Sequence, residues 1–443
     1  MAGRATWASR VGFVLAAAGA AVGLGAIWKF PWLAGSNGGS AFLLPYLVLS
    51  FTLGLVFLVA EITLGYLGRG SIVSTMKRLA SAKWLPVGYM GVLTGLLVLS
   101  FYSVIGGWTL AYLIDALLGN GLITDQAELG ARFGALSGNP TLAIGYQALF
   151  LALTAGVVAL KVNRGIELLS KILMPALFIL MLIIILRGLT LPGAEAGLSY
   201  LFAFRPEAFT VESLYAALGF TFFSLCVGCG CMMTYGSYLP EGSRIFKSCF
   251  TIVSLTVLAS VLGALMVMPP VFAFGLDPAA GPGLTFVTMP AVFAQLPFGG
   301  LFAVAFYACL AFAALTSSVS LLELDAAFLI DEFKFSRAGA SFACSVVVMV
   351  AGIFCALSFG PLADSKFLGK NVFDWFDFLT SNLFLPIGGL AVALLAGIFC
   401  WPRVKEAITA SENVPQALLA LFRVLLVVAC PALVIAVLVT GLI

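Results

Sequence analysis

The sequence predicts an all-α polytopic membrane protein of eleven transmembrane helices, and three observations support this prediction. First, 62% of the 443 residues are hydrophobic and only 9% are charged, whereas an average soluble domain is about 25% charged. Second, apolar runs of about 20 residues, the length that crosses a bilayer, recur along the whole chain. Third, glycines interrupt two of these runs, five spans apart. This spacing indicates two repeats of five helices followed by one extra helix.

The apolar runs define the order of the elements. They place the spans at about residues 10–34, 41–67, 86–119, 141–160, 165–187, 210–238, 245–275, 296–333, 339–358, 371–401 and 415–441. The first repeat then covers residues 1–187, the second covers 188–401, and the extra helix lies within 402–443. We expect the three segments to form a single domain.

Lysine and arginine are distributed unevenly between the two sides of this predicted bundle. If the N-terminus is inside, the inner loops carry fifteen of these residues and the outer loops carry five. Cytoplasmic loops carry such an excess, so we expect the N-terminus in the cytoplasm and, after eleven spans, the C-terminus outside. The net charge of +3 is the remainder of this bias and does not indicate a nucleic-acid partner.

Cysteine and histidine content limits the chemistry that is possible. All nine cysteines fall within or at the ends of predicted spans, so we expect no disulfide framework. Cys226, Cys229 and Cys231 form a C-x-x-C-x-C sequence, but the chain has no histidine and no carboxylate lies nearby. Packing is therefore a better interpretation of these thiols than a zinc site. Without a metal-ligand cluster or a nucleophile–base pair, the sequence does not indicate an enzyme.

The two interrupted spans are the most informative feature. The first reads G-A-A-V-G-L-G-A-I-W-K-F-P at 19–31 and is broken at 21–25, and the sixth is broken at S-L-C-V-G-C-G, 224–230. Glycines in one span could simply be close helix contacts. Breaks at matching positions of two halves are instead typical of a transporter site at the membrane midplane. Unwound backbone there can bind a cation through its carbonyls and an anionic group through helix N-termini.

Several motifs, in this order, resemble the bacterial branch of the neurotransmitter:sodium symporter family. They are W-A-S-R at 7–10, the broken first span, N-G-G-S-A-F at 37–42, E-I-T-L-G-Y at 61–66, F-F-S-L-C-V-G-C-G at 222–230, T-Y-G-S-Y-L at 234–239, L-T-S-S at 315–318 and D-W-F-D-F-L-T-S at 374–381. The resemblance covers nearly the whole chain. It implies a LeuT-type fold, in which the five-helix repeats are inverted and helices 1 and 6 are broken, in the subgroup with eleven helices.

The resemblance implies a function as well. Members of this family couple sodium entry to the uptake of amino acids or related amines by alternating access. We therefore expect a sodium symporter in a bacterial inner membrane, surrounded by lipid and present as a monomer or weak homodimer. Two alternatives remain: a carrier on the same scaffold that uses protons or no ion for another organic solute, and a channel or non-transporting ligand sensor. The hydroxyl pair Thr316–Ser317 favours sodium, and charges retained on both sides of the site disfavour a channel.

By this resemblance, the chain has a suitable residue at every ligand position of one sodium site. The family's second site uses carbonyls of the first and eighth spans with two adjacent hydroxyls, and the matching residues are Gly19, Val22, Ala313, Thr316 and Ser317. Hydroxyls in spans often bond to their own helix. The broken first span beside this pair favours the ion site instead.

The first sodium site of the family is degenerate here. It uses a carbonyl at Ala21, side-chain amides at two positions and oxygens at Ser224. The amide positions hold Ala26, which has no side-chain oxygen, and Thr256. We expect this site to be absent or very weak, unless a water fills the space that alanine leaves.

The chloride position of the family gives a mixed pattern. Chloride-dependent members carry a small hydroxyl where this chain has Ser260, and Tyr46 and Ser224 also match anion contacts. The expected glutamine is replaced by Phe220. Chloride use therefore stays open at the level of sequence.

The resemblance places a substrate between the two breaks. Backbone N–H groups of residues 21–25 and the Tyr102 hydroxyl would hold a carboxylate, and carbonyls would accept from the ammonium group. Cys229 stands where some relatives carry an aromatic residue, and the extra space favours a substrate with a large aliphatic or aromatic side chain. Many amine carriers hold a carboxylate at the position of Ala20. Alanine supplies none, which disfavours a substrate without its own carboxylate. The implied substrate-binding residues are Ala20, Ala21, Leu24, Gly25, Val98, Tyr102, Phe223, Ser224, Cys226, Cys229, Ser317 and Leu321.

Charges on both sides of the breaks match the gates of the family. The implied gate residues are Lys29 and Asp377 outside, above the aromatic lid Phe223, and Arg4, Asp331, Trp7 and Tyr238 inside. Lysine at position 29 replaces the usual arginine and loses its bidentate fork, so the outer latch is expected to be weaker.

Three carboxylates lie deep within the predicted spans. Glu61 matches a family residue that braces the broken first helix. Glu323 and Asp325 have no role derived from the sequence, although Glu323 is a candidate proton site because buried ionisable residues in membranes are costly.

Overall fold

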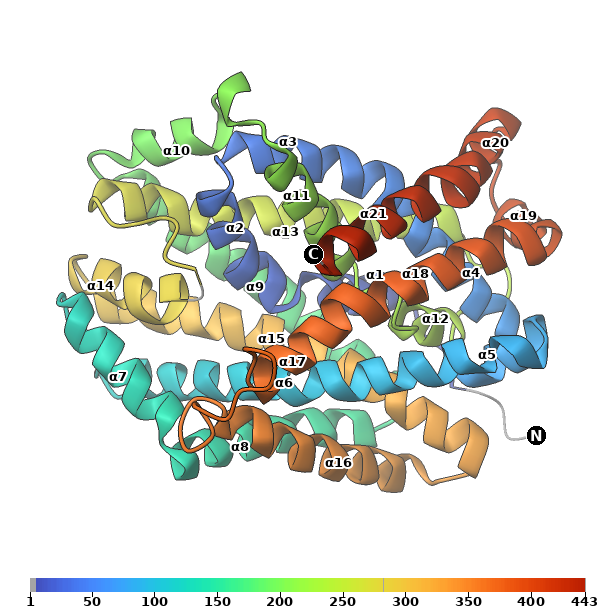
Figure 1. Ribbon diagram of the computed structural model, residues 1–443, viewed down its shortest axis with the longest axis horizontal. Helices are drawn as coiled ribbons and strands as arrows, with labels where there is room; N and C mark the ends of the chain where they lie inside the picture. Colours follow the sequence, from blue (N-terminus) through green and yellow to red (C-terminus); the bar gives the residue numbers. More distant parts are fainter. Residues whose placement is uncertain (1–4, 282, 443) are drawn as a thin grey trace.

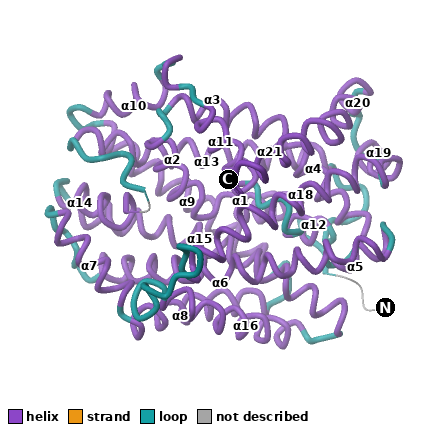
Figure 2. Tube along the Cα trace, in the orientation of Figure 1, coloured by secondary structure: helices purple, strands orange, loops and turns teal. Residues whose placement is uncertain are grey.

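The structure is a computed structural model that describes residues 5–281 and 283–442. Those residues form helices and loops and contain no β-strand, as Figures 1 and 2 show. The all-α prediction is therefore confirmed. In the described residues, ten helical segments are long and apolar enough to cross a membrane: Arg10–Ser36, Ser40–Gly68, Ala82–Leu117, Pro140–Ala159, Ile166–Leu189, Ile245–Ala273, Gly299–Phe333, Arg337–Leu357, Val372–Phe399 and Gln416–Ala436.

Some of these segments are single helices, three others contain one π-helical turn, and Val372–Phe399 contains two, at Leu379–Phe384 and Leu395–Phe399. The single helices are α6 (Leu85–Leu117), α8 (Pro140–Ala159), α9 (Ile166–Leu189), α13 (Ile245–Ala273), α15 (Gly299–Phe333) and α16 (Arg337–Leu357). A π-helical turn joins α1 (Arg10–Leu24) to α2 (Phe30–Ser36), α3 (Ser40–Leu49) to α4 (Leu55–Gly68), α17 (Val372–Phe378) to α18 (Leu385–Leu394), and α20 (Gln416–Val424) to α21 (Cys430–Leu442). Such turns often mark functional positions in helices.

The sixth predicted span is not one long helix. It consists of α11 (Val211–Ser224) and α12 (Cys231–Gly236), each shorter than a membrane crossing, with residues 225–230 between them. Short helices also occur where no span was predicted: α5 (Ile72–Leu79), α7 (Gln126–Gly138), α10 (Ala194–Phe202), α14 (Met289–Ala294) and α19 (Trp401–Thr409). Spans were predicted from apolar runs of membrane length. These short helices contain no such run, so the sequence did not predict them.

The two ends of the bundle carry different short helices. In Figure 1, α5, α19 and α20 lie at one end, and α7, α10 and α14 lie at the other. The basic residues Lys77 and Arg78 belong to α5, and Arg403 and Lys405 belong to α19. The structure therefore brings these basic segments to one end, the end that the charge bias predicts to be cytoplasmic.

Local signals explain where several helices begin, and packing explains which helix is central. The side chains of Ser9, Asn139 and Ser336 accept hydrogen bonds from backbone N–H groups in the first turns of α1, α8 and α16. Nearly every residue of α1 is buried, as expected for a helix that is apolar on all sides. It is enclosed by α9, α13 and α15, so the broken helix lies in the core of the bundle.

Candidate functional site

The break in the first span is centred on one residue. Gly23 has φ 38° and ψ −167°, outside the helical region. A Cβ at this position would lie 2.5 Å from Ser317 Oγ on α15. Only glycine allows both this backbone conformation and this close approach. The predicted interruption at 21–25 is confirmed, although helical geometry resumes directly after Gly23.

The second break is longer and is held by an acidic side chain. Between α11 and α12, Cys226, Gly228 and Gly230 have φ values of 50°, 97° and 90°, so the chain turns repeatedly through a region that L-residues seldom adopt. Glu61 Oε2 on α4 accepts a hydrogen bond of 2.8 Å from the Gly228 N–H. The expectation that Glu61 braces the first span needs correction, because this bond fixes the break in the sixth span.

A small cavity lies between the two breaks. Its volume is about 40 Å³, which holds a few waters but not an amino acid. The residues that line it are Ala20, Ala21, Gly23, Leu24, Gly25, Val98, Tyr102, Phe223, Cys226, Cys229, Ser317, Leu321, Ser381 and Leu385. None of these side chains carries a charge, so any ionic group of a ligand would have to be met by backbone dipoles and hydroxyls.

The cavity collects eleven of the twelve residues proposed for substrate binding. Ser224 is the exception: it is buried, and its Oγ donates to the Thr221 carbonyl at 3.3 Å. The prediction missed Gly23, Ser381 and Leu385. Ser381 ends the D-W-F-D-F-L-T-S motif and Gly23 lies within the predicted break, so both positions had a signal in the sequence. Leu385 had none.

Polar groups in the cavity are aimed at the broken first helix. The Tyr102 hydroxyl on α6 accepts a hydrogen bond of 3.1 Å from the Leu24 N–H, which the irregular backbone at Gly23 leaves without a helical acceptor. The Cys226 thiol donates to the Ala20 carbonyl at 3.2 Å. An N–H and a phenol hydroxyl at one point form a suitable pair of donors for a carboxylate.

Neutral oxygens of the first and eighth spans gather beside the cavity. Ser317 Oγ donates to the Gly19 carbonyl at 3.1 Å and to the Ala20 carbonyl at 2.9 Å. Thr316 Oγ1 donates to the Ala313 carbonyl at 3.0 Å. A Cβ on Gly19 would lie 3.1 Å from Thr316 Cβ, so the two sets of oxygens adjoin.

Four of the five predicted ligands of the second sodium site are thus adjacent. The fifth, the Val22 carbonyl, accepts the Gly25 N–H and retains one lone pair. A hydroxyl that turns its proton away exposes its lone pairs, so this oxygen set can coordinate a monovalent cation without a buried carboxylate.

The degenerate first sodium site has two hydroxyls that donate to carbonyls of their own helices and one position without a side-chain oxygen. Thr256 Oγ1 donates to the Ile252 carbonyl of its own helix at 2.9 Å, and Ser224 Oγ bonds within α11. Ala26 is buried and offers no side-chain oxygen. The site therefore lacks a side-chain oxygen at Ala26, although donation within their own helices leaves lone pairs on the Thr256 and Ser224 hydroxyls.

The chloride-related positions form a hydrogen-bonded and aromatic cluster. The Tyr46 hydroxyl and Ser260 Oγ lie 3.0 Å apart, and Ser260 also donates to the Thr256 carbonyl. The Phe220 ring packs 5.3 Å from the Tyr46 ring, centroid to centroid. The Phe220 ring thus occupies the place where the amide donor of a glutamine was expected.

Lys29, one of the two charged residues of the predicted outer gate, lines a second cavity. This cavity of about 460 Å³ extends outward from Phe223 and is lined in part by Lys29, Ser381 and Asn382. Lys29 Nζ lies 4.4 Å from the Phe223 ring centroid, while Asp377 accepts a hydrogen bond of 2.9 Å from Ser381. No ion pair of the described residues joins Lys29 to Asp377. Phe223 lines both cavities, together with Ser381 and Leu385, and the described residues do not form the predicted ion pair of the outer latch in this conformation.

The inner side is closed by an aromatic plug. Trp7 is buried, its backbone N–H donates to the Tyr238 carbonyl at 3.1 Å, and its indole Nε1 donates to the Tyr235 carbonyl at 3.0 Å. Asp331 Oδ2 accepts the Ser71 N–H at 2.6 Å. Arg4, the predicted partner of Asp331, lies outside the described residues.

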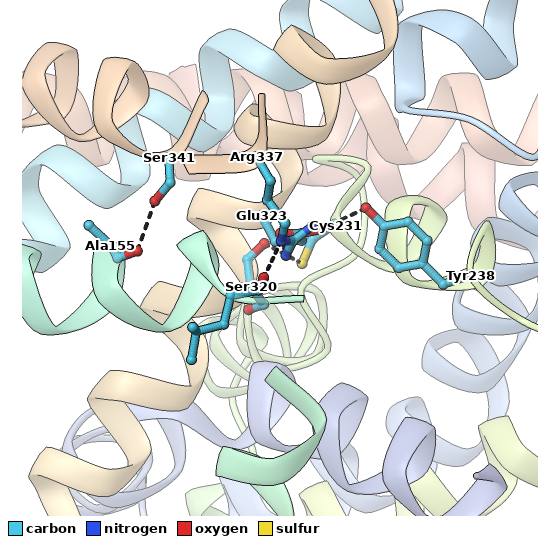
Figure 3. A network of polar contacts seen from close by, with 8 residues as sticks. Ala155, Cys231, Tyr238, Ser320, Glu323, Arg337 and Ser341 are labelled. Atoms are coloured by element: carbon cyan, nitrogen blue, oxygen red, sulfur yellow. Dashed lines mark hydrogen bonds and ion pairs between the residues drawn. The ribbon is translucent and has the colours of Figure 1, made fainter. Parts of the chain in front are cut away.

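A charged network next to this plug explains Glu323. Figure 3 shows Tyr238 and Arg337 converging on its carboxylate. The Tyr238 hydroxyl donates to Oε1 at 2.6 Å, and Arg337 donates to Oε1 and Oε2 at 3.1 and 2.6 Å. A guanidinium fork stabilises the charged form of a carboxylate. This pairing argues against Glu323 as a proton site and makes it a structural link between α15, α16 and the loop that follows α12.

Removing the cation of this network should destabilise the protein. The Arg337→Met variant leaves the fully buried Glu323 with only the Tyr238 donor. We expect the free energy of unfolding to fall by about 2 kcal/mol, less than for a fully buried pair because Arg337 is 20% exposed. Thermal melting of the purified protein measures this. The double variant Glu323→Gln/Arg337→Met should recover most of the loss, and a double variant that melts as low as the single one would contradict this explanation.

Comparison with known proteins agrees with this geometry. Residues 4–122 and 138–443 match the sequence profile described as "Sodium:neurotransmitter symporter family". The chain is 42% identical over 389 residues to the "Uncharacterized sodium-dependent transporter YhdH" of Bacillus subtilis (strain 168), covering 88% of this chain and 86% of the relative. It is 27% identical over 378 residues to the human "Sodium- and chloride-dependent GABA transporter 2", covering 74% of this chain and 62% of that one.

A solved structure is similar over the full length. The "Crystal structure of MhsT in complex with L-phenylalanine" aligns with a TM-score of 0.91 at 38% sequence identity, covering 99% of this chain and 100% of that one. Two independent signals, sequence profile and three-dimensional similarity, therefore agree over nearly all of the chain.

Proposed function

Because this chain belongs to the sodium:neurotransmitter symporter family, a family of sodium-coupled secondary transporters and not of enzymes, we propose that it takes up amino acids with large apolar or aromatic side chains. The observation that carries this proposal is the meeting of three groups at Gly23: the Leu24 N–H, the Tyr102 hydroxyl and the Ser317 hydroxyl. A substrate carboxylate and a sodium ion can bind on the two sides of this one break in the helix.

The lining of the cavity supports the class of substrate. Val98, Phe223, Leu321 and Leu385 supply an apolar wall, and no ionised side chain enters the cavity. An amino acid brings its own carboxylate and ammonium, which the freed backbone groups can meet. The similar protein MhsT has been solved with L-phenylalanine. Because the cavity holds only a few waters, binding must move the lid Phe223 or the wall that faces it.

We further propose that one sodium ion accompanies each substrate. The oxygens of Gly19, Ala313, Thr316 and Ser317 are adjacent, whereas Ala26 offers no side-chain oxygen at an amide position of the first site. We also propose that transport does not require chloride. The chain lacks the amide ligands of the first sodium site, and the Phe220 ring replaces the glutamine of the chloride position.

The location follows from the charge bias. We place the protein in a bacterial inner membrane with the N-terminus in the cytoplasm and the C-terminus outside. The inner plug of Trp7 is then closed toward the cytoplasm, and the 460 Å³ cavity opens outward.

A thermal-shift screen tests the proposed substrate class. Purified protein is melted with each of the twenty amino acids and with common amines, in sodium or in potassium chloride. A ligand that binds only the folded state at 100 times its Kd adds about 2.7 kcal/mol of stability. We expect stabilisation by L-phenylalanine, L-leucine or similar amino acids, and only in sodium. A hit restricted to amines without a carboxylate, or one of equal size in potassium, would contradict the proposal.

A further inference from the structure

A second acidic residue of α15, Asp325, lies two residues after Glu323, and the proposed transport cycle does not use it. Asp325 is 1% exposed and lies eight residues before the end of α15 at Phe333, which is about 12 Å along a helix axis. Within the described part of the chain, neither carboxylate oxygen has a hydrogen-bond partner. Such burial of a polar group without a partner is costly and is uncommon without a functional reason.

The neighbouring helix leaves room for this side chain. At Gly95 of α6, an added Cβ would lie 2.8 Å from Asp325 Oδ1 and 3.1 Å from Oδ2. The carboxyl group therefore packs directly against the backbone of α6, at a point where any other residue would displace it. The contact fixes the position of the acid and supplies no N–H donor to it.

The charged groups around Asp325 are already engaged. The helices α6, α8, α15 and α16 contain one lysine or arginine between them, Arg337, and its fork is bound to Glu323. The titratable Cys344 on α16 is in electrostatic contact with Asp325 and offers no positive charge. Cations on the other elements packed against α15 also have partners, which are Glu167 for Lys171 of α9, Glu332 for Lys77 of α5, the Gly68 carbonyl for Arg78 of α5, Thr190 for Arg187 of α9, Ser248 for Arg10 of α1 and the Phe223 ring for Lys29. An anionic Asp325 would thus be an unpaired charge in an apolar interior.

We propose that Asp325 is a proton-binding site, which holds a proton while the inner side is closed and releases it when the inner side opens. The O–H bond of the neutral carboxyl breaks, the electron pair stays on the Asp325 oxygen, and water on the cytoplasmic side accepts the proton. The anion left behind attracts Arg337, the one cation on the surrounding helices, away from Glu323. The Tyr238–Glu323–Arg337 network beside the Trp7 plug then loosens.

The sign of the pH dependence follows from this exchange. The closed form binds one more proton than the open form, so lowering the cytoplasmic pH favours the closed form and raising it favours opening. Because the proton leaves to the cytoplasm and returns from it, no net proton crosses the membrane. This inference does not rest on the identity of the substrate, and both experiments below omit any substrate.

Infrared spectroscopy tests whether the proton is present. Purified protein near neutral pH should show the C=O stretch of a protonated carboxyl group without hydrogen bonds, and this band should be missing from Asp325→Asn. The matched control, Glu332→Gln, removes a carboxylate that is paired with Lys77 and should leave the band unchanged. An identical band in wild type and Asp325→Asn would overturn the proposal.

Alkylation of a native thiol tests the link to the inner plug. Cys231 at the start of α12 is buried and donates to the Ser320 carbonyl, so its reaction with N-ethylmaleimide, measured by mass spectrometry, reports opening. Asp325→Asn carries the same thiol, so the ratio of wild-type to variant labelling removes the direct effect of pH on that thiol. This ratio should rise about fivefold between pH 7 and pH 9, which corresponds to a change of about 1 kcal/mol in the free energy of opening.

A ratio that stays constant with pH would overturn the proposed link. If Asp325→Asn fails to fold, Asp325→Val supplies the same neutral reference with an apolar side chain. If labelling of Cys231 in the wild type changes with pH in the same way as in Asp325→Val, the proposal is also contradicted.

Discussion

Replacement of Ser317 by alanine should weaken sodium binding by about 100-fold, which corresponds to roughly 2.7 kcal/mol. The Ser317 hydroxyl is the side chain that bonds to both Gly19 and Ala20 carbonyls at the broken helix. Its loss removes one oxygen ligand and the hydroxyl donor of both carbonyls, although the Ala20 carbonyl keeps the Cys226 thiol. The measurement is the sodium concentration that gives half-maximal thermal stabilisation of the purified protein, with L-phenylalanine present if the screen identifies it.

The adjacent serine provides a matched control. Ser318 Oγ lies 2.8 Å from Thr154 Oγ1 and donates to the Leu315 carbonyl, so it faces α8 and not the broken helix. Ser318→Ala should change the sodium midpoint less than threefold, because it removes no proposed ligand. Equal sodium midpoints for Ser317→Ala and wild type would refute the assignment of this site.

The second large effect concerns the backbone. Gly23→Ala should reduce sodium-dependent substrate binding below detection while leaving the protein in the membrane fraction. The new methyl group would lie 2.5 Å from Ser317 Oγ and 3.3 Å from the Tyr102 hydroxyl. In addition, φ 38° with ψ −167° costs an alanine about 1–3 kcal/mol. The substitution therefore displaces a sodium ligand and a substrate ligand together.

A glycine elsewhere distinguishes this effect from a general loss of stability. Gly130 in α7 has no heavy atom within 4 Å of an added Cβ, so Gly130→Ala should raise helix stability by up to about 1 kcal/mol and preserve binding. Ligand-dependent melting of both variants in parallel is the measurement. Normal binding by Gly23→Ala would show that the break does not need glycine.

Much of this fold could be predicted because it leaves a strong signal in the sequence. Apolar runs of membrane length mark ten long helices, since each must face lipid or other helices over about 20 residues. The breaks at 21–25 and 224–230 are visible because glycines interrupt the apolar runs at matching positions of the two halves. Most of the cavity residues were implied by the family resemblance, and even the missed Gly23 and Ser381 lie inside motifs that the sequence analysis singled out.

Other features could not be predicted from the sequence, because they depend on contacts between residues that are far apart in the chain. The pairing of Glu323 with Arg337 joins α15 to α16 through side-chain directions that no periodicity encodes. The bond from Gly228 to Glu61 likewise depends on how α4 packs against the second break. The separation of Lys29 from Asp377 belongs to a conformation, and one sequence serves every conformation of the cycle.

The central claim is that a single sodium ion binds between the opened first helix and the hydroxyls of α15. Equilibrium binding of radioactive ²²Na⁺ to the purified full-length protein tests it most directly. The account predicts one bound ion per chain in wild type and in Ser318→Ala, and none at the same sodium concentration in Ser317→Ala. Two ions per wild-type chain, or one ion retained in Ser317→Ala, would contradict it.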